Sequence, residues 1–122
     1  MIQTVHSWLS GYPGLESLKQ EHLAAAPGSA GLFCQGQQVL RENTDILGNV
    51  VRRVQLRFLL AVHCCEASTP QRLLDLDRWA QQSAPTLGQM QTLRCQKGRL
   101  VRADAQGTAR YETEIIFEFT EV

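Results

Sequence analysis

One long alternation of side-chain character, from Val50 to Cys65, constrains this chain more than any other feature. From Arg53 onward the even positions of this stretch are apolar, namely Val54, Leu56, Phe58, Leu60, Val62 and Cys64. The odd positions begin polar and become more apolar, through Arg53, Gln55, Arg57, Leu59, Ala61 and His63. A period of two predicts a β-strand with one buried face. A strand of this length bends, twists strongly or changes its partners along the sheet.

A second alternating segment, from Arg110 to Glu121, predicts another strand. One of its faces carries Tyr111, Thr113, Ile115, Phe117 and Phe119. The opposite face carries Glu112, Glu114, Glu118 and Thr120, with Ile116 as the exception. Before it we expect a strand from Thr92 to Val101, broken near Lys97 and Gly98, and a turn over residues 103–108.

Two segments have helical spacing. Apolar residues predict a first helix over residues 2–10, which ends at the Gly-Tyr-Pro-Gly of residues 11–14. The Ser-Thr-Pro of residues 68–70 is a helix start, and Leu73, Leu76 and Trp79 or Ala80 line the apolar face that follows. This second helix ends at Ala84-Pro85. We expect Trp8 and Trp79, on the apolar faces of these helices, to pack in the core.

The part between residues 15 and 49 is less regular. Residues 15–23 fit a helical turn or a strand, residues 26–31 a loop, and residues 32–34 and 39–42 two short strands. Asp45–Asn49 carries a Gly-Asn turn signal that predicts a hairpin. Its apolar Ile46 and Leu47 either reach toward a partner or fold back on the core. The order of elements predicts an α+β domain spanning residues 1–122, with a mostly antiparallel sheet and both helices on one face.

Composition excludes several classes of protein. With 122 residues the chain has room for one core, and 12 basic and 12 acidic residues cancel to a net charge of zero. We therefore expect no direct nucleic-acid binding through overall charge. No run approaches the roughly 20 apolar residues of a membrane span, and no signal peptide is visible. Free thiols in a cytosolic compartment are the expectation for the four cysteines.

Few residues suggest chemistry. The chain has no phosphate-binding glycine motif and no metal-ligand spacing, so we expect no cofactor and no metal. His63 adjoins Cys64, but neighbouring strand residues point to opposite faces. We expect a buried cysteine beside a half-exposed histidine. A small enzyme that uses Cys64 or Cys95 with His63 stays open as an alternative. Asp75 and Asp77 diverge on the helix and form no paired acid–base site.

Charged side chains on the strands suggest a function more clearly than the residues that could carry out chemistry. If the strand with Arg53 and Arg57 neighbours the strand with Glu112, Glu114 and Glu118, the charges pair across the sheet. If not, they form opposite patches suited to head-to-tail assembly. A second, basic cluster contains Arg94, Lys97, Arg99 and Arg102. It is a solvated hairpin face, a protein interface or, without interleaved aromatic residues, a weak nucleic-acid site.

The order of several short motifs carries a resemblance over nearly the full length. These are Trp8-Leu9, Pro27-Gly28-Ser29, the strand at residues 52–58 after its Gly-Asn turn, Leu76-Asp77-Arg78-Trp79, and Asp104 before Thr108-Ala109-Arg110-Tyr111. In this order the chain resembles the small minor capsid or tail-completion proteins of prophages in Gram-positive bacteria. Those proteins are similar in size and topology to the tail terminator of phage lambda and to tail-to-head joining proteins.

The resemblance implies a structural phage protein and not an enzyme. It implies an α+β subunit that forms a six-membered ring on the head-proximal end of the tail tube, stops tube polymerisation and offers a joining surface to the head. The partners would be the tail tube protein, a head-side connector or stopper protein, and further copies of the chain, without a membrane. The expected location is the tail or neck of the virion, and the host cytoplasm during assembly.

Residue roles follow from the same resemblance. We expect contacts between subunits or with the tube to be made by Arg53, Arg57, Glu112, Glu114 and Glu118. We expect contacts above or below the ring to be made by Arg94, Arg99 and Arg102. The alternatives are another head–tail connector, neck or minor capsid adaptor protein, and an α+β interaction module that is not from a phage.

Overall fold

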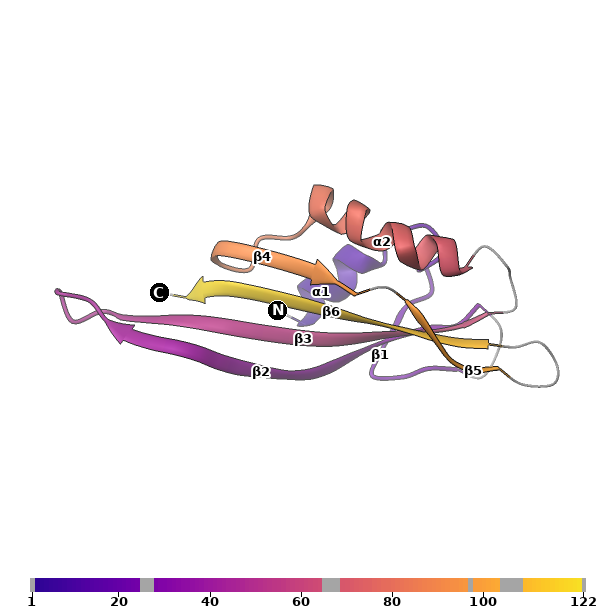
Figure 1. Cartoon of the computed structure of the whole chain (residues 1–122), viewed down its shortest axis with the longest axis horizontal. Coiled ribbons are helices and arrows are strands. Elements are labelled where there is room, and N and C mark those ends of the chain that lie inside the picture. The colour runs from indigo at the N-terminus through magenta and orange to yellow at the C-terminus, as the bar shows by residue number, and fades with distance from the viewer. Residues whose placement is uncertain (1, 25–27, 65–68, 97, 104–108, 122) are drawn as a thin grey trace.

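The computed structural model describes residues 2–24, 28–64, 69–96, 98–103 and 109–121. It contains two helices and six strands, in the order α1 (Ile2–Leu9), β1 (Lys19–Gln20), β2 (Ala30–Thr44), β3 (Val50–Cys64), α2 (Thr69–Ser83), β4 (Gln89–Cys95), β5 (Arg99–Ala103) and β6 (Ala109–Glu121). The strands form one sheet in the order β1-β2-β3-β6-β4, and β5 also pairs with β6. Only β1 and β2 run parallel. The predicted α+β class is confirmed (Figure 1).

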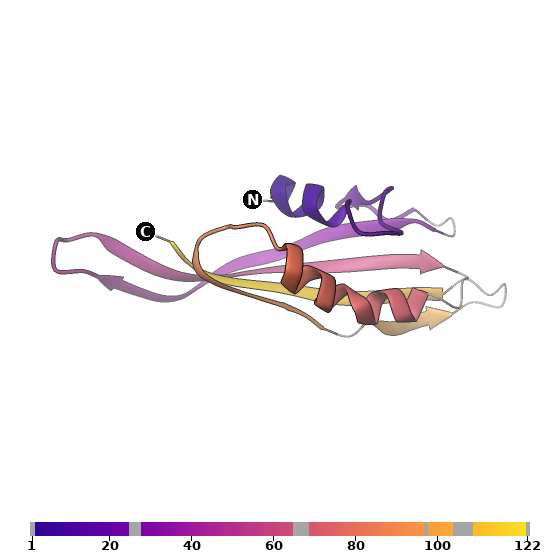
Figure 2. The same ribbon diagram turned by 90° about the horizontal axis from the view of Figure 1, so that it is seen from above.

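Both helices cover the same face of the sheet, as the sequence predicted (Figure 2). Phe58, Phe117 and Phe119 are fully buried between the sheet and apolar residues of α1 and α2. Trp8 and Trp79 stack with ring centroids 5.2 Å apart and pack against this core, which ties the two helices together. Burial of large aromatic side chains supplies much of the driving force for folding in a domain of this size.

The alternation of β3 is confirmed, because its even positions from Val54 to Val62 are buried among the core residues. The side chain of Cys64 lies outside the described residues. His63 is buried and not half-exposed, so that prediction was wrong. Its Nδ1 lies 2.7 Å from the carbonyl oxygen of Ala24, and its backbone bonds to Gly28 and Ser29. A segment nearly forty residues earlier in the chain therefore covers His63.

Strand β2 is one continuous element where the sequence predicted two short strands. Bulges between Cys34 and Gly36 and between Val39 and Arg41 shift its register against β3. A bulge adds one residue to a strand and so interrupts the alternation that marks it in a sequence. Residues 15–23 form turns followed by the two-residue β1, and Leu15 and Leu18 are buried. The loop predicted from residue 26 ends earlier than expected, because Ala30 already belongs to β2.

The predicted break is confirmed, because the separate strands β4 and β5 take the place of one strand. Both pair with β6, one after the other along its length. Strand β4 begins at Gln89, three residues before the predicted start at Thr92. Most of the predicted turn over residues 103–108 lies outside the described residues, as do residues 25–27 before Gly28 and Lys97.

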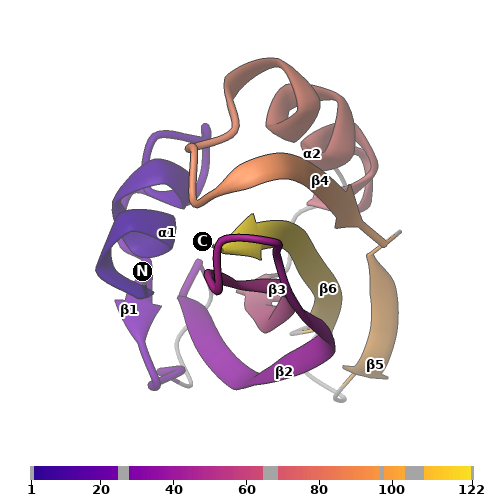
Figure 3. The same ribbon diagram turned by 90° about the vertical axis from the view of Figure 1, so that its left-hand side faces the viewer.

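The hairpin of β2 and β3 extends well beyond the rest of the sheet (Figures 1 and 2), and Figure 3 views the molecule from the end at which this hairpin projects. Pairing of β3 with β6 stops at Arg52, so the residues beyond have only each other as strand partners. We call residues 41–53 the arm. Its tip is the predicted turn, in which Asp45 Oδ1 accepts bonds from the backbone N–H groups of Leu47 and Asn49. Gly48 has a φ of 85°, a conformation that favours glycine.

Candidate assembly surface

The eight charged residues proposed from the sequence lie on one face of the sheet, opposite the helices. Strand register shows this, because paired residues share a face and alternate residues along a strand do so too. Thus Arg57 pairs with Ile116, which in turn pairs with Arg94 on β4. We call this surface the charged face. It contains Arg53, Arg57, Arg94, Arg99, Arg102, Glu112, Glu114 and Glu118.

The acidic and basic strands are neighbours, so the alternative of opposite patches was wrong. Arg57 Nη1 lies 3.4 Å from Glu114 Oε1, across the pairing of β3 with β6. Glu112 pairs with Arg110 on its own strand at 2.9 Å, and in register it also faces Arg99 on β5. Glu118 makes no ion pair in the described part of the chain. The charged face thus mixes both signs within one sheet.

Ile116, the exception in the pattern of β6, is 3 % exposed although it lies on the charged face. Register places Arg57 on one side of it and Arg94 on the other. Long arginine stems cover apolar neighbours while their guanidinium groups stay in water. The alternation therefore failed at Ile116 for a physical reason, since arginines from two other strands flank it.

The basic cluster is divided between two strands. Arg94 lies on β4, and Arg99 and Arg102 lie on β5, which is exposed along its whole length. Leu100 and Val101 of β5 are also about half exposed. Because β6 lies beside both strands, the glutamates of β6 lie next to these arginines. Arg94, Arg99 and Arg102 therefore share the charged face with the glutamates of β6.

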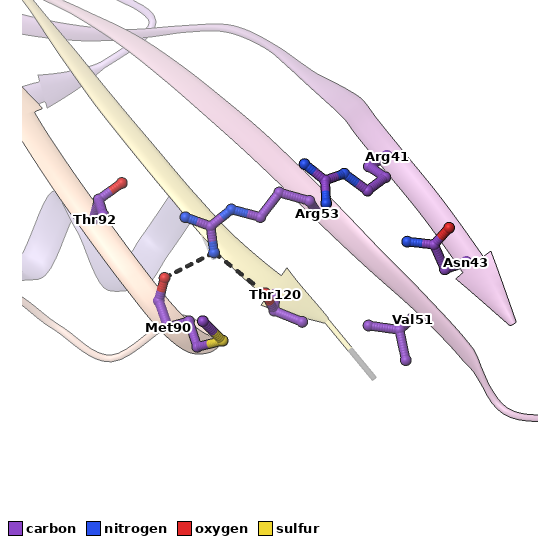
Figure 4. Close-up of a pocket in the computed structure, with 7 residues that line it drawn as sticks. All are labelled: Arg41, Asn43, Val51, Arg53, Met90, Thr92 and Thr120. Atoms are coloured by element: carbon purple, nitrogen blue, oxygen red, sulfur yellow. Dashed lines mark hydrogen bonds between the residues drawn. The ribbon is translucent and has the colours of Figure 1, made fainter. Parts of the chain in front are cut away.

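A groove opens on the charged face where the arm leaves the body (Figure 4). Its volume is about 500 Å³. The arm contributes Arg41, Asn43, Val51 and Arg53, and the body contributes Met90, Thr92 and Thr120. We call this space the arm groove.

Arg53 spans the arm groove without a carboxylate partner. Its Nη1 donates to the carbonyl oxygen of Met90 at 2.7 Å and to Thr120 Oγ1 at 3.2 Å (Figure 4). Both acceptors are neutral, so the positive charge of Arg53 is not compensated there. Arg41, its neighbour in the register, makes no ion pair within the described residues either. The groove therefore presents two guanidinium groups beside the apolar Val51 and Met90.

Sequence reasoning identified Arg53 but missed Arg41 and Met90. Arg41 follows the second bulge of β2, where the alternation is interrupted. Met90 has a φ of 50° within a shifted stretch of β4, and its side chain is 81 % exposed. A methionine between two glutamines gives no periodic signal. The one hint was an apolar residue in polar surroundings.

The arm tip is the most exposed apolar part of the described chain. Ile46 is 101 % exposed and Leu47 is 83 % exposed, so the alternative in which the tip folds back on the core was wrong. The backbone N–H of Asn49 bonds to the Asp45 carboxylate, and this bond lowers the pKa of Asp45 below its usual value. The tip therefore carries a carboxylate beside two apolar side chains.

Cys95 has the environment of a structural cysteine. Burial, and secondarily the charge of Asp77, raises the pKa of its thiol to about 12. Reactive cysteines have the opposite property, a lowered pKa in an accessible setting. Asp77, which the sequence assigned to the helix alone, accepts a 3.0 Å hydrogen bond from the backbone N–H of Cys95.

Two other kinds of site are absent from the described ranges. Residues 2–24, 28–64, 69–96, 98–103 and 109–121 hold no group of three His, Cys, Asp or Glu side chains that could bind a metal ion. Neither helix in those ranges has the length and apolar character needed to cross a membrane. No protein-family model matches the chain, and no curated protein matches it in sequence.

Proposed function

We propose that this chain is a structural phage protein that caps the head-proximal end of a tail tube as a six-membered ring. The ring stops tube polymerisation and offers the surface on which the head joins. The observation that carries this proposal is the arm, which projects Ile46 and Leu47 into solvent away from the body. The resemblance of the sequence to tail-completion proteins supplies the class of assembly.

The arm supports a role in assembly, because it is unfavourable to expose the apolar side chains of its tip to water. Large apolar side chains that protrude together mark contact sites with other proteins. The tip and the arm groove are different surfaces of one molecule, so a contact between them joins copies head to tail. Such contacts generate a ring when the rotation between subunits closes.

The charged face supplies the remaining contacts in this proposal. Arg53 lies at the base of the arm, and Arg57, Glu112, Glu114 and Glu118 lie on the strands of the body. These five residues serve contacts with neighbouring copies or with the tail tube protein. Arg94, Arg99 and Arg102 lie toward the outer edge of the same face and serve a partner above or below the ring, such as the head-side connector. A mixed-sign surface of this kind favours specific orientation over raw affinity.

Electron microscopy of phage lysates tests the proposal directly. Lysates from an induced host with the reading frame intact are compared with lysates from a host in which it is deleted. The proposal expects uneven, overgrown tails beside filled heads without tails in the deletion. Re-expression of the intact chain from a plasmid is the control, and it should restore particles of uniform tail length.

Other outcomes would contradict the proposal and favour a different reading. Tails of normal length that fail to join heads would indicate a connector-side neck protein. Normal infectious particles from the deletion would exclude a role in virion assembly. An α+β interaction module outside phages, or an enzyme that uses a thiol, would then be the next hypothesis to test.

A further inference from the structure

We propose that the arm tip of one copy binds in the arm groove of the next copy, with Ile46 and Leu47 against Val51 and Met90, and Asp45 facing Arg41 and Arg53. This inference rests on the proposed ring and names the contact that joins its subunits. The charge, the apolar surface and the geometry of the two sites support this contact.

Charge complementarity identifies a second copy as the occupant. The tip holds one carboxylate, that of Asp45, which its own turn keeps ionised through bonds to Leu47 and Asn49. The groove holds Arg41 and Arg53, and neither has a carboxylate partner in the described part of the chain. A carboxylate brought next to two uncompensated guanidinium groups gains charge-assisted hydrogen bonds.

The apolar surfaces match in the same way. Ile46 and Leu47 are 101 % and 83 % exposed in the single chain, and Met90 is 81 % exposed at the rim of the groove. Met side chains are flexible and adapt to an inserted apolar group. The groove has a volume of about 500 Å³, enough for the side chains at the tip of a hairpin.

Geometry makes the contact intermolecular. The groove begins at Asn43 and Val51, only a few residues from the turn, and those residues are held in the pairing of β2 with β3. The tip cannot turn back into a space formed by its own base without breaking that pairing. The ladder of β2 and β3 thus holds the tip away from its own groove and free for a neighbour's.

Disulfide trapping tests the contact, and it detects a weak association that a sizing column would miss. The background replaces Cys34, Cys64 and Cys65 by serine and keeps the buried Cys95. One chain carries Leu47→Cys and a second chain, tagged to differ in mass, carries Met90→Cys. The two are mixed under oxidised glutathione, and the mixed disulfide is followed by non-reducing gel electrophoresis.

The matched control pairs Leu47→Cys with Leu74→Cys, an exposed apolar position on α2. We expect the Leu47–Met90 disulfide to form about tenfold faster than the control, because docking raises the effective concentration of the two thiols. Adding Arg41→Glu to the Met90→Cys chain should remove most of that advantage. Equal rates for the two pairs, or no effect of Arg41→Glu, would overturn the inference.

A second measurement covers the case in which the serine background does not fold. In the otherwise natural chain, Leu47→Asp and the double change Arg41→Glu with Met90→Asp each destroy one of the two surfaces. In lysates, each variant alone should give overgrown tails, as the deletion does. Normal tails from both variants beside overgrown tails from the deletion would contradict the arm contact and leave the proposed function standing. Trapping that succeeds while the deletion gives normal particles would support the arm contact and contradict the proposed function.

Discussion

The body and the arm contain parts of the same two strands, β2 and β3, but their surroundings differ. In the body, β3 lies between β2 and β6, and its core-facing side chains from Val54 to Val62 are buried under the helices. In the arm beyond Arg52, the same strand pairs with β2 alone, and side chains on both faces are open to solvent. The hydrogen-bond ladder is continuous, so the covering layers and not the backbone distinguish the two regions.

The two edges of the sheet repeat this contrast. The outer edge of β4 is occupied by α2, since Asp77 accepts from the N–H of Cys95 and Gln81 Nε2 donates to the carbonyl oxygen of Leu93 at 2.5 Å. Among the described residues, the outer edge of β2 is covered only at its start, where β1 pairs with Gly31 and Leu32 and Glu21 accepts from the N–H of Cys34. Uncovered edges invite pairing with other chains. We infer that the body is built for stability and the arm for contact.

The largest expected effect on folding is in the body, at Phe117. Phe117→Ala should lower the free energy of unfolding by about 3–5 kcal/mol, because a fully buried ring is replaced by a cavity. Urea denaturation followed by tryptophan fluorescence measures this, since Trp8 lies against Phe117. A loss under about 1 kcal/mol would mean that the body is less tightly packed than the structure indicates.

Cys95 should make the stability of the body depend on pH in the alkaline range. An unfolded thiol ionises near pH 9, whereas the folded one ionises near 12, so the folded state holds its proton longer. Stability is complete below pH 9 and falls as the pH rises toward 12, by about 1.4 kcal/mol for each pH unit at most. The measurement compares unfolding of the natural chain with that of Cys95→Ala across this range. Equal pH profiles would contradict the prediction.

Asp77 should matter more than its neighbour on the same helix. Asp77→Ala leaves the N–H of Cys95 without its acceptor and should cost about 1–2 kcal/mol of unfolding free energy. Asp75→Ala is the matched control, because Asp75 is exposed and accepts a hydrogen bond from Gln71 on its own helix. Thermal or urea unfolding of the two variants measures the loss of unfolding free energy in each. Equal losses would show that the covered edge of β4 does not depend on Asp77.

Ion pairs should be weaker contributors, and weakest in the arm. A double-mutant cycle on Arg57 and Glu114 should give a coupling free energy of roughly 0.2–1 kcal/mol. The same cycle on Arg52 and Glu42 of the arm should give less, because both of those side chains are about half exposed. A larger coupling in the arm would reverse the comparison between the two regions.

The smallest effect on stability is expected at the tip. Leu47→Asp should change the free energy of unfolding by less than about 0.5 kcal/mol, because the side chain touches nothing that folding buries. Urea denaturation of this variant beside Leu74→Asp measures it. A loss above about 2 kcal/mol would show that the tip supports the fold of the single chain, and it would remove the reason to assign the tip to contact.

Much of the body was predictable because its strands alternate. The pattern from Val54 to Val62 located the core face, and that of Phe117 and Phe119 located its partner strand. The continuity of β2 was not predictable, because two bulges interrupt its period. The burial of His63 was not predictable either, since a carbonyl group from Ala24 reaches it through the fold.

The candidate surface was predictable only in part. Individual charges such as Arg57 and Glu114 were evident from the sequence, whereas their common face depends on the register of β3 with β6. The arm groove could not be predicted, because Arg41, Arg53 and Met90 come from three strands and meet only after the sheet twists. Side chains brought together by distant segments leave no local pattern.

The measurement that tests this account most directly is the distribution of tail lengths for an arm variant and a body-surface variant. Lysates carrying Ile46→Asp with Leu47→Asp are compared by electron microscopy with lysates carrying Leu74→Asp, after both proteins are shown to unfold like the natural chain. The account predicts uneven, overgrown tails and unattached heads for the arm variant, and uniform tails for Leu74→Asp. Uniform, head-joined tails from the arm variant would contradict it.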